Sequence, residues 1–234
     1  MAGANPVPGL FVTGTDTGVG KTLVSVSLVK ALVHHGLRVS AMKPIASGSE
    51  HTPSGLRNAD ALALAGASNI AVPYATLNPY CFEPAISPHF AAEEAGIEVN
   101  LGIIKERYLA LASGADFVVV EGAGGWYAPI SSTRRMSDLP ALLNVPTLLV
   151  VGLRLGCLNH ALLTKRAIDA HGLELAGWVA NCIDPTLERS AENLASLAQM
   201  LGSEPLAVFP FEPDSQFNVR CGEHIGRRLS LISF

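Results

Sequence analysis

One short segment constrains this chain more than any other feature of its sequence. The segment GTDTGVGKT (residues 14–22) follows an apolar run at residues 10–13 and opens a helix-forming stretch at residues 21–35. Between a strand and a helix, the N–H groups of a glycine-rich loop can surround phosphate oxygens at the positive end of the helix. Lys21 would then reach the β and γ phosphates, and the Thr22 hydroxyl would bind Mg²⁺. The segment therefore predicts a nucleotide-binding phosphate loop.

The loop departs from the strict spacing of such motifs. Thr15 stands where the first glycine is required, and Gly14 comes one place early. The alternative is a glycine-rich turn that begins a helix and binds nothing. The preceding strand, the following helix and three glycines in the loop together favour nucleotide binding.

The rest of the chain alternates short β-branched runs with longer helical stretches. This order is typical of a parallel sheet covered by helices. The runs at 117–120 and 147–151 are uninterrupted and apolar, as in strands buried on both faces. We predict an α/β, three-layer, P-loop NTPase-like fold with a mostly parallel sheet covered by helices on both faces. Its strands are expected at 10–13, 39–42, 117–120, 147–151, 175–180 and 206–209, and its helices at 21–35, 58–66, 88–96, 101–113, 158–171 and 187–201.

Length and composition bound the domain count and the partners. The 234 residues contain no evident linker, so we expect a single domain over residues 1–234, with residues 1–8 as a flexible N-terminus. A net charge of −4 argues against a nucleic-acid surface, and no apolar run approaches the roughly 20 residues of a membrane span. The start lacks the features of a secretory signal, and four cysteines without a Cys-x-x-Cys pair predict free thiols. We therefore expect a cytoplasmic protein.

Two acidic residues are candidates for a metal site opposite the phosphate loop. Glu121 follows the predicted strand 117–120 and precedes three glycines within four residues, so it can hold Mg²⁺ while a ligand approaches the backbone. The alternative for Glu121 is an acid that caps a loop. Asp60 lies where a loop runs into a helix, and its alternative is a solvated residue that interacts with the helix dipole. The residue chemistry of Asp60 alone favours neither interpretation.

Several further segments accompany the phosphate loop in a fixed order. They are Lys43-Pro44 with ASG (46–48), GLRNAD (55–60), NPY (78–80), SPH (87–89), EGAGGW (121–126), LGCLNH (155–160) and GWVAN (177–181). Together they resemble the dethiobiotin synthase family, ATP-dependent enzymes of biotin synthesis. The resemblance runs from about residue 10 to residue 212, and the combined set of motifs is specific although a phosphate loop alone is not.

The resemblance implies a set of site residues. It places Mg²⁺ among Thr22, Asp60 and Glu121, and it makes Lys43, Lys21 and Thr17 the catalytic residues. Ser47 would contact substrate, and the substrate carboxylate would bind to Gly156, Cys157, Leu158 and Asn159. The nucleotide would be bound by Gly18, Val19, Gly20, Lys21, Thr22, Leu23, Asp60, Glu121, Gly122, Ala123, Gly124, Asn181, Cys182, Pro210, Phe211 and Glu212, with Asn181 expected to read adenine.

The family resemblance also implies a reaction and an assembly. The substrates would be ATP, CO₂ and diaminopelargonic acid, and the reaction would close a cyclic urea through a carbamate and a carbamic–phosphoric anhydride. The carboxylate site would lie across a homodimer interface, so the partner chain would complete each active site. The plainer alternatives are a surface position for Lys43 and a simple N-cap role for Asn159.

Two positions depart from the family pattern. Gly18 stands where some relatives carry an acid, and Cys182 stands where some carry Asp, so contacts made by those acids are lost here. The main rival function is a partner-regulated ATPase of the ParA/MinD kind. Those proteins usually carry an extra lysine near the start of the loop, where this chain has Thr15 and Asp16. An amidotransferase of the cobyrinic-acid type and a plain small-molecule kinase are weaker rivals.

Overall fold

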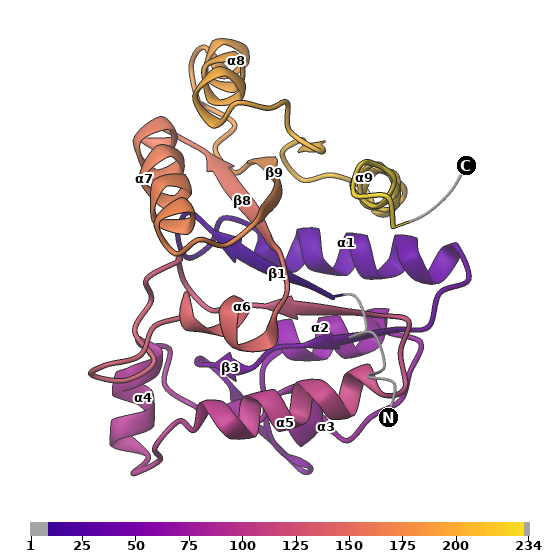
Figure 1. Cartoon of the computed structure of the whole chain (residues 1–234), viewed down its shortest axis with the longest axis vertical. Coiled ribbons are helices and arrows are strands. Elements are labelled where there is room, and N and C mark those ends of the chain that lie inside the picture. The colour runs from indigo at the N-terminus through magenta and orange to yellow at the C-terminus, as the bar shows by residue number, and fades with distance from the viewer. Residues whose placement is uncertain (1–8, 232–234) are drawn as a thin grey trace.

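A six-stranded parallel sheet forms the centre of the computed structural model, which describes residues 9–231 (Figure 1). The strand order is β10-β9-β8-β1-β7-β2, and every neighbouring pair is parallel. Helices cover both faces, so the predicted three-layer α/β class is confirmed; the expected flexible segment 1–8 lies outside the described residues. The strands are β1 (Gly9–Gly14), β2 (Val39–Met42), β7 (Phe117–Glu121), β8 (Thr147–Leu153), β9 (Leu175–Cys182) and β10 (Val208–Phe209).

Nine helices and two small two-stranded sheets accompany the central sheet within residues 9–231. The short strands are β3 (Ile45–Ala46) paired with β6 (Tyr80–Cys81), and β4 (Glu50–Thr52) paired with β5 (Gly55–Arg57). The helices are α1 (Lys21–His34), α2 (Ala59–Ala67), α3 (Tyr74–Leu77), α4 (Pro88–Glu94), α5 (Leu101–Ala112), α6 (Asp138–Leu143), α7 (Cys157–Ala170), α8 (Ser190–Leu201) and α9 (Ser215–Arg228).

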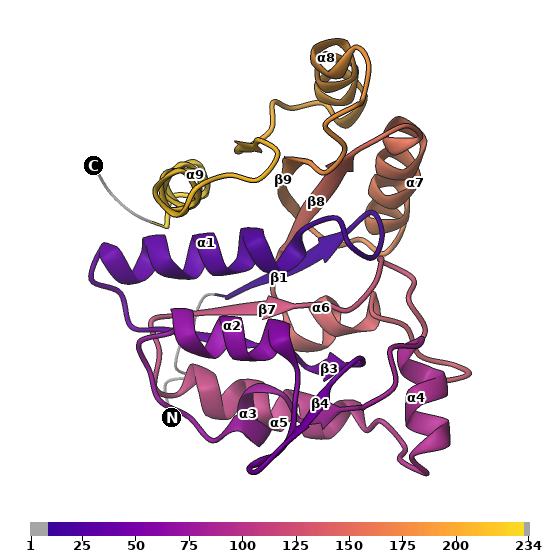
Figure 2. The ribbon, with the colours of Figure 1, turned by 180° about the vertical axis from the view of Figure 1, so that it is seen from behind.

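The two faces of the sheet pack against different sets of helices. Because successive side chains of a strand point to opposite faces, Leu10 and Val12 of β1 pack with apolar residues of α1, α2 and α9. Phe11 points the other way and packs with residues of α4, α5 and α6. A further cluster on that side joins β8 and β9 to α7 and α8. Figure 2 shows α1, α2 and α9 on the face that is turned away in Figure 1.

The strand order decides which loops meet at the carboxyl edge of the sheet. β7 lies between β1 and β2, with Val12 opposite Glu121 and Met42 opposite Val120. The phosphate loop after β1, Lys43 after β2 and Glu121 at the end of β7 are therefore brought to one place. Ligands of open α/β sheets bind at this edge.

The predicted elements differ from the observed ones mainly at their ends. The last strand begins at Val208 rather than 206, and α8 begins at Ser190 rather than 187. The segment 47–84, for which only the helix at 58–66 was predicted, also contains β4, β5, α3 and β6. α6 was not predicted, since it has only six residues and contains a proline in its first turn.

The C-terminal helix α9 was also not predicted. Most of its residues are polar, and the apolar residues that join the core, Phe217, Cys221 and Ile225, form a narrow stripe with a spacing of four residues. This stripe packs against α1, and Gly222 allows the close approach because a Cβ there would meet the carbonyl oxygen of Ser27.

Candidate active site at the carboxyl edge of the sheet

The phosphate loop has the backbone shape that its glycines allow. Gly18 and Gly20 have φ values of 74° and 92°, in the left-handed region that favours glycine. Gly20 is the N-cap of α1 and has no side chain that could cap the helix, so the first N–H groups are available to a ligand at the positive end of the dipole. Local geometry thus supports the predicted binding of an anion at this loop.

Lys21 ends the phosphate loop and begins α1, and it forms no ion pair with a carboxylate among residues 9–231. Its Nζ donates a hydrogen bond to the backbone oxygen of Asp16 at 3.0 Å. Burial, followed by the nearby charge of Lys43, lowers the pKa of Lys21 to about 8. A buried ammonium held only by a carbonyl gains strongly from an incoming phosphate.

Lys43 lies between two carboxylates. Its Nζ is 2.6 Å from Oε1 of Glu121 and 3.0 Å from Oδ2 of Asp60, and it also donates to the backbone oxygen of Gly122 at 3.4 Å. Burial opposes the charge of Lys43, but Glu121 and then Asp60 outweigh it and raise the pKa of this lysine above its ordinary value. Lys43 therefore keeps its positive charge although it is buried.

The same cluster fixes Asp60 and Thr22. The Thr22 hydroxyl donates to Oε1 of Glu121 at 2.8 Å, which joins the phosphate loop to β7. Burial works against ionisation of Asp60, but Lys43, and then Thr22 and Lys21, bring the pKa of Asp60 below its ordinary value. Asp60 is therefore a carboxylate at neutral pH.

Oxygen atoms of this cluster fit a magnesium ion. Mg²⁺ prefers hard oxygen ligands and commonly binds through one or two carboxylates together with substrate phosphates. Glu121 is fully buried, and its Oε2 has no hydrogen-bond partner in the described part of the chain. Across residues 9–231 no three His, Cys, Asp or Glu side chains converge on a metal site, so this site would need the Thr22 hydroxyl and the nucleotide as well.

A cavity of about 360 Å³ opens between the phosphate loop and Lys43. It brings together all three catalytic candidates, all three metal candidates and Ser47. Asn58 and Ala46 also line it; neither was predicted as a site residue, although both lie in motifs noted in the sequence, GLRNAD (55–60) and ASG (46–48). The lining residues are Thr17, Gly18, Gly20, Lys21, Thr22, Lys43, Ala46, Ser47, Asn58, Asp60, Glu121, Ala123 and Gly124.

Other predicted nucleotide residues lie outside the lining of this cavity. Asn181, at the end of β9, donates from Nδ2 to the backbone oxygen of Val19 at 2.9 Å, so it supports the phosphate loop in this structure. Cys182 follows it and is partly buried. Val19 and Leu23 pack into the apolar core beneath the loop. The carbonyl oxygen of Gly122 accepts a hydrogen bond from Lys43. Residues 210–212 directly follow β10.

The predicted carboxylate site at residues 156–159 also lies apart from the cavity. Gly156 is the N-cap of α7, with a φ of 94°, and Cys157 is buried in the first turn. Leu155 beside it is 90% exposed, and Leu163 on the same helix is exposed as well. The segment is a helix N-terminus next to an exposed apolar surface.

One contact at the site was not predicted from the sequence. Arg154, just after β8, forms an ion pair with the carboxylate of Asp16, which also accepts the N–H of Thr17 at 2.7 Å. The pair links the phosphate loop to the turn before α7. The only sequence signal was a charged residue directly after a buried strand.

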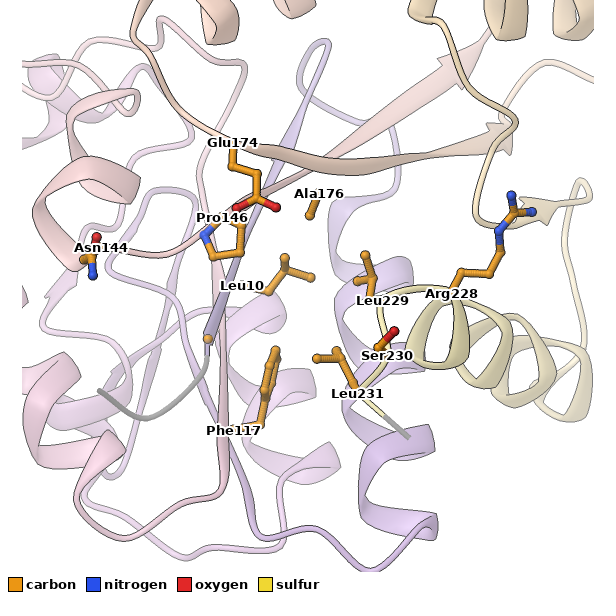
Figure 3. Close-up of a pocket in the computed structure, with 11 residues that line it drawn as sticks. Leu10, Phe117, Asn144, Pro146, Glu174, Ala176, Arg228, Leu229, Ser230 and Leu231 are labelled. Atoms are coloured by element: carbon orange, nitrogen blue, oxygen red, sulfur yellow. The ribbon is translucent and has the colours of Figure 1, made fainter. Parts of the chain in front are cut away.

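A second cavity of about 410 Å³ lies at the amino ends of the strands (Figure 3). Leu10, Phe117 and Leu229 form much of its apolar wall, while the Arg228 guanidinium points away from them and donates to Pro205. Glu174 is the one carboxylate among its described lining residues. This cavity therefore lacks the converging charges of the site at the opposite edge.

Comparison with known proteins identifies the family. A family model described as an AAA domain matches residues 8–218. ATP-dependent dethiobiotin synthetase BioD of Pseudomonas paraeruginosa is 51% identical over 205 residues, covering 87% of this chain and 90% of the relative. The BioD of Xanthomonas oryzae pv. oryzae is 48% identical over 209 residues, covering 89% and 93%. The chain belongs to the ATP-dependent dethiobiotin synthetase family. The resemblance seen in the sequence, and the enzyme class of ATP-dependent ligases that form C–N bonds, are confirmed.

Solved structures at low sequence identity share the fold of this chain. The MinD cell division protein of Aquifex aeolicus has a TM-score of 0.61 at 16% identity, with 97% of this chain and 98% of that chain covered. A ParA family ATPase from Chlorobium tepidum TLS has a TM-score of 0.54 at 13% identity, with 96% of each chain covered. At such low identity the likeness shows the fold alone. Among the described residues, no helix has the length and apolar character needed to cross a bilayer.

Proposed function

We propose that this chain converts diaminopelargonic acid, CO₂ and ATP into dethiobiotin, ADP and phosphate, as a homodimer in the cytoplasm. The observation that carries this choice of reaction is the 51% identity to an ATP-dependent dethiobiotin synthetase over 87% of the chain. The cavity geometry supports it independently, since two lysines and two carboxylates line one cavity at the carboxyl edge of the sheet.

The proposed reaction has three steps. One amine of the substrate adds to CO₂ and loses a proton, which gives a carbamate. A carbamate oxygen attacks the γ-phosphorus of ATP, the bond from that phosphorus to the bridging oxygen breaks, and ADP leaves. The second amine then attacks the carbonyl carbon of the mixed anhydride, loses a proton and expels phosphate as the ring closes.

The phosphate loop and Lys21 bind the nucleotide in this proposal. Phosphoryl transfer depends mainly on positioning and on neutralising charge. The N–H groups at the start of α1 and the Lys21 ammonium supply fixed positive charge, and Thr17, which lines the cavity, contacts the transferring group. A magnesium ion held by Thr22, Asp60 and Glu121 would add further charge neutralisation on the phosphates.

Lys43 acts on the carbamate side of the transferring phosphoryl group. Its ammonium faces the same cavity as Lys21 and stays charged because of its carboxylate partners. It therefore stabilises both the carbamate anion and the charge that develops on phosphorus oxygens. Ser47, on the same cavity wall, holds the substrate.

The remaining contacts are assigned to the base and to the substrate carboxylate. Adenine binds near Asn181, Cys182 and residues 210–212, at the ends of β9 and β10. The carboxylate binds at the N-terminus of α7 of the partner chain, since residues 156–159 do not line the cavity of their own chain. The exposed Leu155 and Leu163 support an interface at this helix.

Omission of each substrate in turn tests the reaction. Phosphate release and dethiobiotin formation should be equal in amount and should require ATP, bicarbonate and diaminopelargonic acid together. Phosphate release that ignores the diamine and responds to a protein partner would support a ParA/MinD-like ATPase instead. Light scattering tests the assembly, and a fully active monomer would contradict the shared site.

A further inference from the structure

The Asn-Pro-Tyr segment at residues 78–80 lies outside the cavity but is bonded to the backbone of Lys43. Asn78 is 2% exposed, and its Nδ2 donates to the carbonyl oxygen of Lys43 at 2.6 Å and to that of Tyr80 at 3.1 Å. The N–H of Lys43 donates to the carbonyl oxygen of Leu77 at 2.9 Å. Both backbone polar groups of Lys43 are thus fixed by the end of α3.

Tyr74 links Asn78 to the helix that carries Asp60. The Tyr74 hydroxyl donates to Oδ1 of Asn78 at 3.0 Å and accepts the backbone N–H of Asn58 at 2.8 Å. Asn58 is the N-cap of α2, with its side chain accepting from Ala61 at 3.2 Å. Asp60 is the second residue of that helix.

These bonds form a closed ring with the ion pair in the cavity. The ring runs from the Lys43 backbone through Asn78 and Tyr74 to Asn58, along the start of α2 to Asp60, and back to the Lys43 ammonium at 3.0 Å. Asn58 also donates to the carbonyl oxygen of Ser47 at 3.3 Å, so a second cavity residue is joined to the ring. A small shift of Tyr74 or Asn78 would therefore move the lysine and its acidic partner relative to each other.

We propose that Tyr74 and Asn78 are positioning residues for the reaction: they hold the Lys43 backbone and the start of α2 in register, so that the Lys43 ammonium meets the transferring phosphoryl group. This inference rests on the proposed function for its kinetic consequence. Displacement of a catalytic group by about 1 Å can cost on the order of 10²-fold in rate, so such a support affects turnover without touching substrate.

Tyr74→Phe is the sharpest variant, because it removes only the hydroxyl. The ring stays in place beneath the guanidinium of Arg57, whose Cζ is 4.2 Å from the ring centroid. We expect kcat to fall about threefold to tenfold, because the bonds to Asn78 and Asn58 are both lost, while the KM for ATP changes less than about twofold. Asn78→Asp, which keeps the acceptor but loses both donors, should lower kcat further.

Tyr80→Phe is a matched control. The Tyr80 hydroxyl also accepts a backbone N–H at 2.8 Å, from Asn100, but it has no bond to the ring. The two variants should lose similar thermal stability, whereas kcat of Tyr80→Phe should stay within about twofold of the wild type. Equal losses of kcat in both variants would show a general structural effect and overturn the proposal.

A double-mutant cycle with Lys43→Ala shows whether Tyr74 acts through the lysine. Groups that act as a unit give non-additive effects. The loss from Tyr74→Phe should therefore shrink to within about twofold when Lys43 is already alanine. The same fold-loss in both backgrounds would contradict the proposed positioning role.

Failure of the proposed function can be told apart from failure of this inference. If the wild type forms no dethiobiotin, the proposed reaction is wrong, and crystals of Tyr74→Phe still decide the positioning role. A longer distance from the Lys43 Nζ to the Asp60 carboxylate in the variant supports the inference. An unchanged distance of 3.0 Å would overturn it, whatever the reaction is.

Discussion

The two lysines of the cavity are held in opposite ways. Lys21, in the phosphate loop, has only a backbone carbonyl as a hydrogen-bond partner within the described residues, and burial lowers its pKa to about 8. Lys43, after β2, lies between two carboxylates that raise its pKa despite stronger burial. Two lysines that line one cavity therefore have different electrostatic surroundings.

The difference separates a binding role from a catalytic role. An ammonium without a carboxylate partner gains most from an incoming anion, which suits the nucleotide phosphates. An ammonium already neutralised by its partners binds a ground-state anion less strongly but keeps its charge and position for the transition state. We therefore expect losses at Lys43 to fall mainly on kcat, and losses at Lys21 to include nucleotide affinity.

Lys43→Ala should have the largest effect. Turnover should fall on the order of 10²-fold or more, because the variant removes a charge partner of the transition state. Steady-state formation of dethiobiotin measures this, and calorimetry should show that ATP still binds.

Lys30→Ala is the matched control for that change. Lys30 is an exposed residue of α1, the helix that begins with Lys21, so its removal tests a general charge effect. Turnover of Lys30→Ala should equal that of the wild type. Near-normal turnover of Lys43→Ala would refute its catalytic role.

Glu121→Gln should have the next largest effect. The change keeps the size of the side chain but removes the buried charge that faces both Lys43 and the Thr22 hydroxyl. We expect the Mg²⁺ concentration for half-maximal turnover to rise about 10–100-fold, as for other disturbed metal sites. A titration with Mg²⁺ at saturating ATP measures it, and an unchanged requirement would remove Glu121 from the metal site.

Much of this arrangement could be predicted from the sequence because it follows from local order. A strand that leads into a glycine-rich loop and a helix places Lys21, and strand ends place Lys43 and Glu121, since the carboxyl ends of parallel strands share one edge. These three residues do lie together in the structure. Their roles in the reaction stay predictions.

The tertiary contacts could not be predicted in this way. Asp16 and Arg154 are 138 residues apart, and nothing in either segment indicates the other. The ring through Tyr74 and Asn78 depends on a helix of four residues, which is too short for any periodic signal. The Asn78 side chain also bonds to the backbone carbonyl of Lys43. Every residue has such a carbonyl, so the sequence does not indicate which residue Asn78 contacts.

The affinity for ATP should depend on pH through Lys21. A lysine with a lowered pKa loses its proton first, so in the free enzyme the charged form is depleted as pH rises through about 8. If only the charged form binds phosphate, the apparent Kd for ATP should rise about tenfold between pH 7 and pH 9. Lys43 does not contribute to this pH dependence between pH 7 and pH 9, because its pKa is raised above the ordinary value.

Calorimetry in buffers of different ionisation enthalpy checks the proton count. Binding of ATP at pH 8.5 should take up protons, because bound phosphate restores the charge of Lys21. Lys21→Arg should remove this uptake, since a guanidinium stays charged at that pH. If ATP binding to Lys21→Arg still takes up protons, a group other than Lys21 accepts them.

The smallest effect is expected at Arg154. This arginine supports Lys21, the cavity lysine that has no ion pair within the described residues. The Arg154 and Asp16 side chains are 39% and 46% exposed, so their ion pair is worth at most about 1 kcal/mol. The Asp16 carbonyl holds the Lys21 ammonium, and Arg154→Gln frees the residue that carries it. The affinity for ATP should therefore fall only about twofold to fivefold at low salt, and less at high salt, where the pair is already screened. Turnover at saturating ATP should stay unchanged. A fall in kcat would instead mean that Arg154 also affects Lys43, so that the two lysines do not have separate supports.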